Sequence, residues 1–267
     1  MRTYYFITEG AHDAAAVGRA LYLEGFRHQR KASMLPVVWQ RLLPRTFPFV
    51  GDELDVDAPV PFFYRRGDQS VAVRMAGGIG KLLETMDSDF YVMHLADLKH
   101  MRGVALFMDA DHLSAGEARE CLVQSAAKAN EKRSDEGEEP LCFSPSFLAQ
   151  GRGEIFSVEL KSGVYVFPDN ASSGTLEDLL LDAAKVVYPE IYRDAFDYVD
   201  LAVEKKASKL SGSAKKKATV GCLSNVRYPG KSNQISIYLD RWISRETADK
   251  CQGVRRLMHF VQRFLQD

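Results

Sequence analysis

Gly103-Val-Ala-Leu-Phe-Met-Asp-Ala-Asp111 is the stretch of sequence that decides the fold. Its first six residues carry no polar side chain, which is typical of a strand that is buried on both faces of a parallel sheet. The apolar run stops at Asp109, and Asp111 follows two residues later. A buried strand that ends in carboxylates predicts an α/β protein whose functional groups gather where its strands end.

The segments on either side of this strand continue the pattern. We expect further strands at residues 3–8, 70–75 and 162–167, where β-branched and aromatic side chains are frequent. Helices are predicted at residues 11–24, 81–86, 114–130 and 175–187, and Ser114 with Glu117 forms a capping-box pattern. Strands that alternate with helices predict a parallel, doubly wound, Rossmann-like sheet flanked by helices.

The chain is predicted to contain a core at residues 1–192 and a basic, mainly helical extension at residues 193–267 that packs on this core. Residues 36–68 contain five prolines and no helical period, so we expect an irregular insertion at about residues 30–70. Residues 131–140 are highly charged and predict a surface loop. The last helix is predicted to bury one apolar face, formed by Val254, Leu257, Met258, Val261, Phe264 and Leu265.

Composition favours a globular cytoplasmic protein. The 267 residues are 46% hydrophobic and 27% charged, with a formal net charge of −1. No apolar run is long enough to span a membrane, and the first residues lack the pattern of a signal peptide. The four cysteines show no zinc-ligand spacing, so we expect reduced thiols.

Carboxylates follow three of the predicted strands. The acids Glu9 and Asp13 follow the first strand, Asp109 and Asp111 follow the second, and Asp169 follows the third, with Glu177 in the next helix. Because parallel strands end at one edge of a sheet, these groups are expected to meet there. Crowded carboxylates repel one another, and a divalent cation removes that cost. Oxygen ligands favour Mg²⁺ or Mn²⁺ over zinc.

A helix cap or a loop charge is the alternative interpretation of each acid taken singly, and it is the favoured one for Asp169 or Glu177 alone. The combination of Glu9 with Asp109 and Asp111 favours a metal site.

The second charged feature is a run of eight basic residues without an acid between residues 205 and 231. It predicts contact with nucleic-acid phosphates, for which Lys209, Lys215, Lys216 and Lys217 are the candidates. A solvated helical face is the alternative interpretation of such a run.

Two short motifs resemble those of the Toprim domain, which topoisomerases, primases and OLD-family nucleases share. Thr-Glu-Gly-Ala-His-Asp (8–13) is similar to the first Toprim motif, and Ala-Leu-Phe-Met-Asp-Ala-Asp (105–111) is similar to the second, the Asp-x-Asp motif. Residues 167–180, together with Pro229-Gly230 and Trp242, resemble small stand-alone Toprim proteins that are related to OLD nucleases. The resemblance covers most of the chain but not residues 30–70.

The resemblance implies a Toprim-like fold and an Mg²⁺-dependent nuclease that cleaves DNA or RNA. It implies that Glu9 ligates metal or transfers a proton, and that Asp109 and Asp111 ligate metal. It makes Asp13 and Glu177 candidates for a second ion. Lys216, or one of its two lysine neighbours, is the candidate for stabilising the transition state.

The resemblance also suggests partners and a setting. OLD nucleases carry an ATPase domain that this chain lacks, so a separate ATPase subunit is expected, and an effector in anti-phage defence or stress is the suggested role. The alternatives are a non-enzymatic module that binds nucleic acid or a partner, and a metal-dependent phosphatase.

Other motifs fit this sequence less well. The glycine-rich stretch 77–80 lacks the residues of a Walker A loop, since Met75 and Leu82 stand where Gly and Ser or Thr are required, so it is interpreted as a strand-to-helix turn. His12 and His112 are interpreted as surface histidines near the motifs.

Overall fold

The computed structural model describes residues 1–43, 49–50, 53–54, 61–93, 95–205, 209–210 and 212–266. Within these residues, seven strands form one sheet in the order β2–β5–β6–β1–β7–β9–β8, and a separate short hairpin pairs β3 with β4. The strands are β1 Arg2–Thr8, β2 Arg27–Gln29, β3 Phe49–Val50, β4 Glu53–Leu54, β5 Phe62–Arg66, β6 Gln69–Met75, β7 Met101–Asp109, β8 Arg152–Ile155 and β9 Val158–Phe167.

The centre of the sheet is parallel, as predicted. β1 lies between β6 and β7, and β7 pairs with β9, all in the same direction. Thr8 pairs with Phe107 and Asp109 pairs with Phe167, so β1, β7 and β9 end side by side. β5 pairs antiparallel with β6, and the edge strands β2 and β8 pair antiparallel with β5 and β9, which makes the whole sheet mixed rather than parallel throughout.

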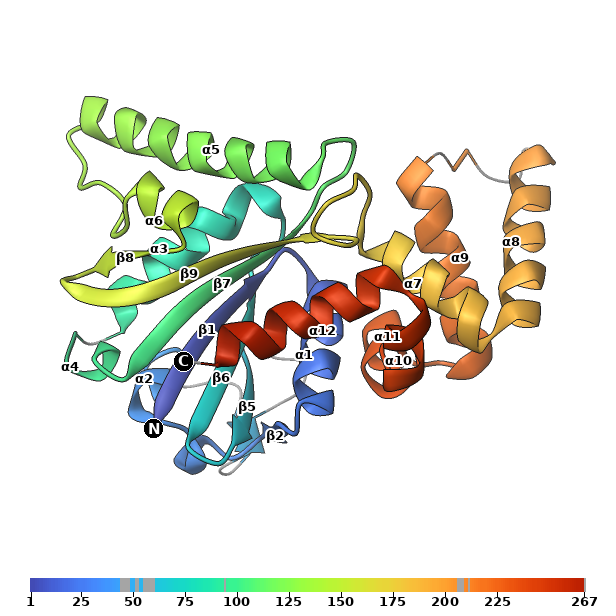
Figure 1. Cartoon of the computed structure of the whole chain (residues 1–267), viewed down its shortest axis with the longest axis horizontal. Helices are drawn as coiled ribbons and strands as arrows, with labels where there is room; N and C mark the ends of the chain where they lie inside the picture. The colour runs from blue at the N-terminus through green and yellow to red at the C-terminus, as the bar shows by residue number, and fades with distance from the viewer. Residues whose placement is uncertain are drawn as a thin grey trace.

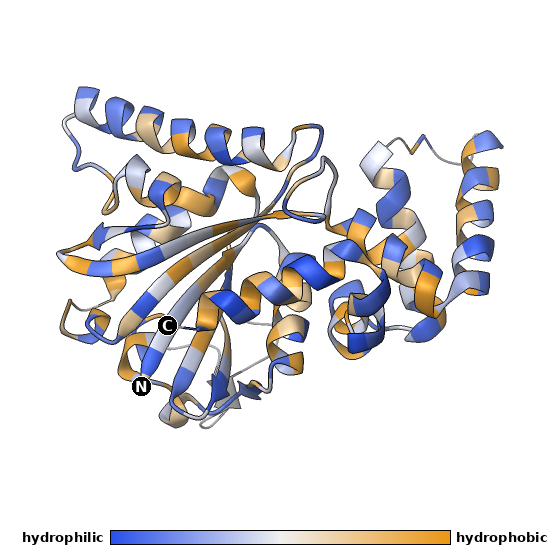
Figure 2. Cartoon of the chain, viewed as in Figure 1, coloured by the Kyte–Doolittle hydropathy of each residue, from blue (hydrophilic) through white to orange (hydrophobic). Residues whose placement is uncertain are grey.

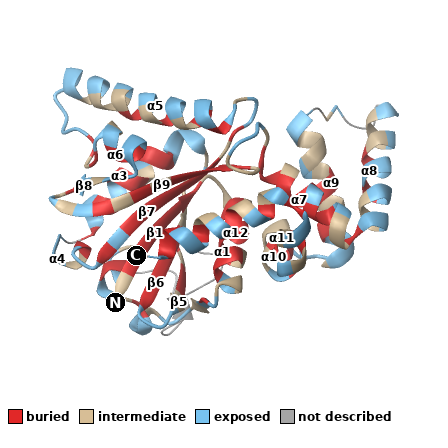
Figure 3. Ribbon diagram, in the orientation of Figure 1, coloured by how far each residue is buried: buried red, intermediate tan, exposed pale blue. Residues whose placement is uncertain are grey.

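Helices cover both faces of the sheet, as Figure 1 shows. α1 and α12 lie on one face, and α3, α5 and α6 lie on the other. The helices of this part are α1 Ala11–Leu23, α2 Val37–Gln40, α3 Leu82–Val92, α4 Leu95–Leu98, α5 Ala115–Asp135, α6 Pro145–Gln150 and α12 Gln252–Leu265, with the 3₁₀ turns η1 Ala32–Met34 and η2 Ile79–Lys81. The central strands are buried over most of their length (Figure 3), which explains their uninterrupted apolar sequence.

The last helix is part of the core rather than an addition to it. All six apolar residues predicted to share its inner face are buried, and hydrophilic and hydrophobic positions alternate along it in Figure 2. Glycines in the strands below allow close packing, because a Cβ at Gly103 or at Gly163 would lie 2.9 Å from the Phe264 ring.

The region between β9 and α12 is helical, as predicted. It contains α7 Leu176–Val187, α8 Pro189–Glu204, α9 Gly212–Arg227, α10 Asn233–Leu239 and α11 Arg245–Lys250. The predicted boundary between the core (residues 1–192) and the extension (residues 193–267) lies inside α8. A division of the chain at this point therefore cuts through a helix.

Two predicted boundaries are corrected. The irregular insertion at 30–70 includes β5 and the start of β6, which pair in the main sheet, although part of the predicted insertion lies outside the described residues. The predicted surface loop at 131–140 is helical up to Asp135, because α5 continues beyond Asn130. None of the helices in the described residues is long and apolar enough to cross a membrane.

Candidate functional site

Glu9 lies at the end of β1, and the turn after β6 holds its backbone. The Glu9 carbonyl oxygen accepts hydrogen bonds from the amides of Gly77 (3.0 Å) and Gly78 (2.9 Å). These glycines have φ values of +82° and +128°, which glycine adopts without strain. The glycine-rich stretch is therefore a strand-to-helix turn, as predicted. The Glu9 carboxylate points toward the next strand, with Oε2 3.5 Å from the amide nitrogen of Asp109.

Asp13 lies one turn further along, in the first turn of α1. Its Oδ2 accepts a hydrogen bond from the Gly10 amide at 2.7 Å, so it stabilises the start of the helix. Only 7% of Asp13 is exposed. The pKa of Asp13 is raised to about 7. Burial is the main cause and the carboxylates of Glu9 and Glu177 contribute, whereas the hydrogen bond from Gly10 lowers the pKa. Asp13 is thus both a helix-capping residue and a member of an acidic cluster.

Asp109 is the last residue of β7 and lies at the centre of this cluster. Its Oδ1 accepts a hydrogen bond from the Leu176 amide at 2.8 Å, which connects β7 to the start of α7. Burial raises the pKa of Asp109 to about 8, and the charges of Asp13, Glu9 and Glu177 add to this effect. Burial also raises the pKa of Glu9.

Glu177 enters the cluster from the first turn of α7. Its side chain is buried, Thr175 Oγ1 donates a hydrogen bond to its Oε2 at 2.9 Å, and His12 Nδ1 lies 3.9 Å from its Oε1. Burial is the largest effect and would raise the pKa of Glu177, but His12, the hydrogen bond from Thr175 and the charge of Lys217 together hold the pKa below its usual value. Glu177 therefore carries a negative charge at neutral pH inside a largely buried group of acids.

Asp111 lies at the outer side of the same edge. Its side chain is exposed and its φ is +53°, in the left-handed region. The Asp111 backbone pairs with Gly174 in the loop after β9, which fixes its position relative to β7 and α7. The negative charge of Asp111 raises the pKa of Glu9, although burial raises it more.

Asp169 does not join the acidic cluster. Its Oδ1 accepts hydrogen bonds from the amides of Ala171 (3.1 Å) and Ser172 (2.7 Å), and its Oδ2 pairs with Arg256 at 3.1 Å. This carboxylate organises its own loop and neutralises an arginine of α12. The structure thus favours the loop-charge interpretation of Asp169 over the prediction that it ligates metal.

The lysines of α9 have different environments. Lys215 pairs with Asp200 of α8, and Lys216 Nζ lies 2.6 Å from Asp178 Oδ1 of α7. Lys217 is exposed. Its positive charge lowers the pKa of both Glu9 and Glu177, whereas burial, which is the larger effect, raises both. Lys217 is therefore the lysine of α9 whose charge acts on Glu9 and Glu177, whereas the sequence singled out Lys216. Lys209 is exposed in the described residues that precede α9.

Comparison with known proteins places the chain in a family. A profile described as "Protein of unknown function (DUF3226)" matches residues 5–266. The chain belongs to the DUF3226 family. A search of curated proteins found no match.

One solved structure resembles this DUF3226 protein. The hypothetical protein PH0156 from Pyrococcus horikoshii OT3 is 18% identical, with a TM-score of 0.52. The similarity covers 99% of this chain and 100% of that chain. At this identity the comparison supports the fold alone.

The donor set of the DUF3226 acidic cluster suits a hard divalent cation. Glu9, Asp13, Asp109 and Glu177 offer only carboxylate oxygens, and Asp111 adds another at the edge. No three His, Cys, Asp or Glu side chains within the described part of the chain already converge on one point as metal ligands. A cation bound here would need these side chains to turn toward one another, and it would replace the protons that Asp13 and Asp109 hold near neutral pH.

A cavity of about 250 Å³ lies beside Asp109 and Asp111, with His112 and Cys121 in its wall. It leaves room for a group larger than an ion next to the two aspartates of the Asp-x-Asp motif.

The sequence did not identify three features of this site. His12 was interpreted as a surface histidine, but it lies beside the buried Glu177. Thr175 supports the same carboxylate, and Lys217 acts on it through charge. The proximity of His12 to Glu9 in sequence was the available signal for His12, whereas the roles of Thr175 and Lys217 depend on how α7 and α9 pack.

Proposed function

We propose that this DUF3226 protein is a metal-dependent phosphodiesterase of Toprim type, which cleaves DNA or RNA. One observation carries the proposal: the partly buried acids Glu9 and Asp109, at the ends of β1 and β7, lie near the buried acids Asp13 and Glu177, at the starts of α1 and α7. The raised pKa values of Asp13, about 7, and Asp109, about 8, follow first from burial and then from the nearby carboxylates. Perturbed acids clustered at a sheet edge are typical of functional sites.

The site residues have distinct roles under this proposal. Glu9, Asp109 and Asp111 hold the first Mg²⁺ or Mn²⁺, and Asp13 and Glu177 are the candidates for a second. A bound divalent ion supplies a water of lowered pKa and neutralises charge on phosphate oxygens. Lys217 replaces Lys216 as the cation that stabilises the charge that develops on the phosphate. His12 and Thr175 keep Glu177 ionised and fix its orientation.

The resemblance of residues 8–13 and 105–111 to Toprim motifs supports the choice of phosphodiester chemistry over other metal-dependent reactions. The order of these motifs matches the order of β1 and β7, which are neighbours in the sheet. A separate ATPase subunit remains part of the proposal by analogy with OLD nucleases.

The test is an assay of plasmid, tRNA and mononucleotide hydrolysis with Mg²⁺, with Mn²⁺ and with a chelator. The proposal expects metal-dependent cleavage of plasmid or tRNA, and loss of it in the double variant Asp109→Asn, Asp111→Asn. Glu138→Gln with Glu139→Gln removes the same charge from exposed positions and serves as the control. Hydrolysis of the mononucleotide alone would favour a phosphatase. Binding without any hydrolysis, with the ATPase partner present, would favour the non-enzymatic module.

A further inference from the structure

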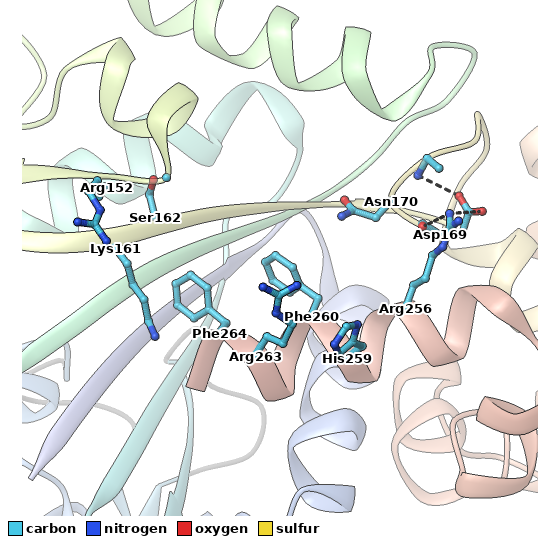
Figure 4. A pocket seen from close by; sticks show the side chains of 12 residues that line it. Arg152, Lys161, Ser162, Asp169, Asn170, Arg256, His259, Phe260, Arg263 and Phe264 are labelled. Atoms are coloured by element: carbon cyan, nitrogen blue, oxygen red, sulfur yellow. Dashed lines mark hydrogen bonds and ion pairs between the residues drawn. The ribbon is translucent and has the colours of Figure 1, made fainter. Parts of the chain in front are cut away.

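A second charged feature lies along α12, away from the basic run of α9. A groove of about 620 Å³ runs between α12 and the edge formed by β8 and β9 (Figure 4). Arg256, His259 and Arg263 line one wall, and Arg152 with Lys161 lines the other. Residues 256, 259 and 263 have the spacing i, i+3, i+7, so they share one face of the helix and span about 10 Å along it.

Few acidic side chains lie close to the basic residues that line this groove. Asp169 is the carboxylate among the lining residues, and Arg256 already pairs with it at 3.1 Å. Arg152 lies 4.0 Å from Glu159, but both side chains are largely exposed, so this pair is weak. Lys161 donates a hydrogen bond to the Gln266 carbonyl oxygen at 2.7 Å. Among the described residues, His259 and Arg263 have no acidic partner.

The floor of the groove decides which part of a ligand it can hold. Phe260 and Phe264 line the groove, but their rings stack on each other with centroids 5.8 Å apart. Phe260 also meets Phe107 edge-on at 5.5 Å. Because these rings pack in the core, they are not free to stack on bases. The available contacts are cationic and suit phosphates.

The groove leads toward the acidic cluster. Asp169, Asn170 and Ala171, in the loop after β9, line its end, as Figure 4 shows for Asp169 and Asn170. Gly174 of the same loop exchanges backbone hydrogen bonds with Asp111. A chain of phosphates held along α12 would therefore reach the edge of the sheet at the site of the acids.

We propose that this groove binds the phosphodiester backbone of single-stranded nucleic acid. Its volume is in the range of pockets that hold small ligands, which fits one strand rather than a duplex. Only the expectation that the bound strand is a substrate rests on the proposed function. The binding itself rests on the groove.

The test is the salt dependence of single-strand binding, followed by fluorescence anisotropy of a labelled oligonucleotide. All proteins carry Asp109→Asn and the buffer contains chelator, so no cleavage occurs. Arg152→Gln with Arg263→Gln should weaken binding and reduce the slope of log K against log salt by about 1.4, at about 0.7 per phosphate contact. Lys128→Gln with Lys132→Gln on α5, across the sheet, is the matched control and should leave the slope unchanged.

Two results would overturn this proposal. One is an Arg152, Arg263 variant that melts like its parent and binds single strands with unchanged affinity and slope. The other is a loss of binding that appears with a duplex probe and not with a single strand. The proposed function fails separately: if the wild-type protein cuts no substrate while the groove variant still loses binding, the groove stands and the nuclease does not.

Discussion

Asp111 and Gly174 exchange two backbone hydrogen bonds, 2.8 Å and 2.7 Å long, that join the loop after β7 to the loop after β9. Gly174 has a φ of +130°, and a Cβ at this position would lie 2.6 Å from Asp178 Oδ2. The same carboxylate accepts a hydrogen bond from the Thr175 amide at 2.9 Å. A single glycine thus allows the Asp-x-Asp loop and the start of α7 to approach each other.

Gly174→Ala should therefore lower the free energy of unfolding by about 1–3 kcal/mol, since it adds both backbone strain and a clash. Thermal and urea unfolding measure the change. Gly116→Ala in α5 is the control, because its Cβ would meet nothing closer than Ser114 Oγ at 3.9 Å, and it should stabilise by up to about 1 kcal/mol. Equal stability of the two variants would show that Gly174 is not required.

The metal-free protein should lose stability as pH rises from about 4 to about 8. Burial and the neighbouring carboxylates raise the pKa of Asp13 to about 7 and that of Asp109 to about 8. The folded state therefore holds protons that the unfolded state releases near pH 4. The stability that these protons provide is fully present below pH 4 and is lost as the pH rises above the folded-state pKa values of Asp13 and Asp109. Tm should therefore fall steadily between pH 4 and pH 8, since each unit by which a pKa is raised corresponds to about 1.4 kcal/mol of stability lost on deprotonation.

Melting curves across this pH range, with and without Mg²⁺, measure the effect. The stabilisation by Mg²⁺ should grow with pH, because the cation replaces those protons. Asp13→Asn with Asp109→Asn should flatten the metal-free profile and abolish the Mg²⁺ effect. A metal-free protein that becomes more stable between pH 5 and pH 8 would contradict the proton-bound cluster.

Replacement of Lys217 should impair cleavage, whereas replacement of Lys216 should mainly lower stability. Lys217→Met removes an exposed charge that acts on Glu9 and Glu177, so cleavage should fall about 100-fold with little change in stability. Lys216→Met breaks the pair with Asp178 and should cost up to about 1 kcal/mol while cleavage stays within a few-fold. Cleavage rates and melting temperatures of both variants test this. The reverse pattern would return the catalytic role to Lys216.

Glu9→Gln should abolish cleavage without unfolding the protein. Burial raises the pKa of Glu9, so removing its charge relieves repulsion and Tm should stay constant or rise. Metal-centred stabilisation contributes several kcal/mol to the transition state, so the rate should drop by about 1,000-fold or more. Glu120→Gln, an exposed acid of α5, is the matched control. A folded Glu9 variant that cuts at the wild-type rate would remove Glu9 from the active site.

The sequence by itself determined the central strands and the acids at their ends. A run such as residues 103–108 is apolar because both faces are buried, and this local signal needs no knowledge of partners. The carboxylates of Glu9 and Asp109 follow such runs directly, and parallel strands end at one edge. The same reasoning identified the buried face of α12 from its period.

Only the tertiary structure decided which charged groups face one another. Asp169 pairs with Arg256, a residue 87 positions away, and Lys216 pairs with Asp178, 38 positions away, so neither is available as the sequence suggested. The strands β5 and β8 carry a weaker apolar signal, because β8 is an edge strand and only β2 separates β5 from the other edge of the sheet. The charge of Lys217 reaches Glu9 and Glu177 because α9 packs on α7, and such packing depends on side chains from distant segments meeting in three dimensions rather than on any local pattern.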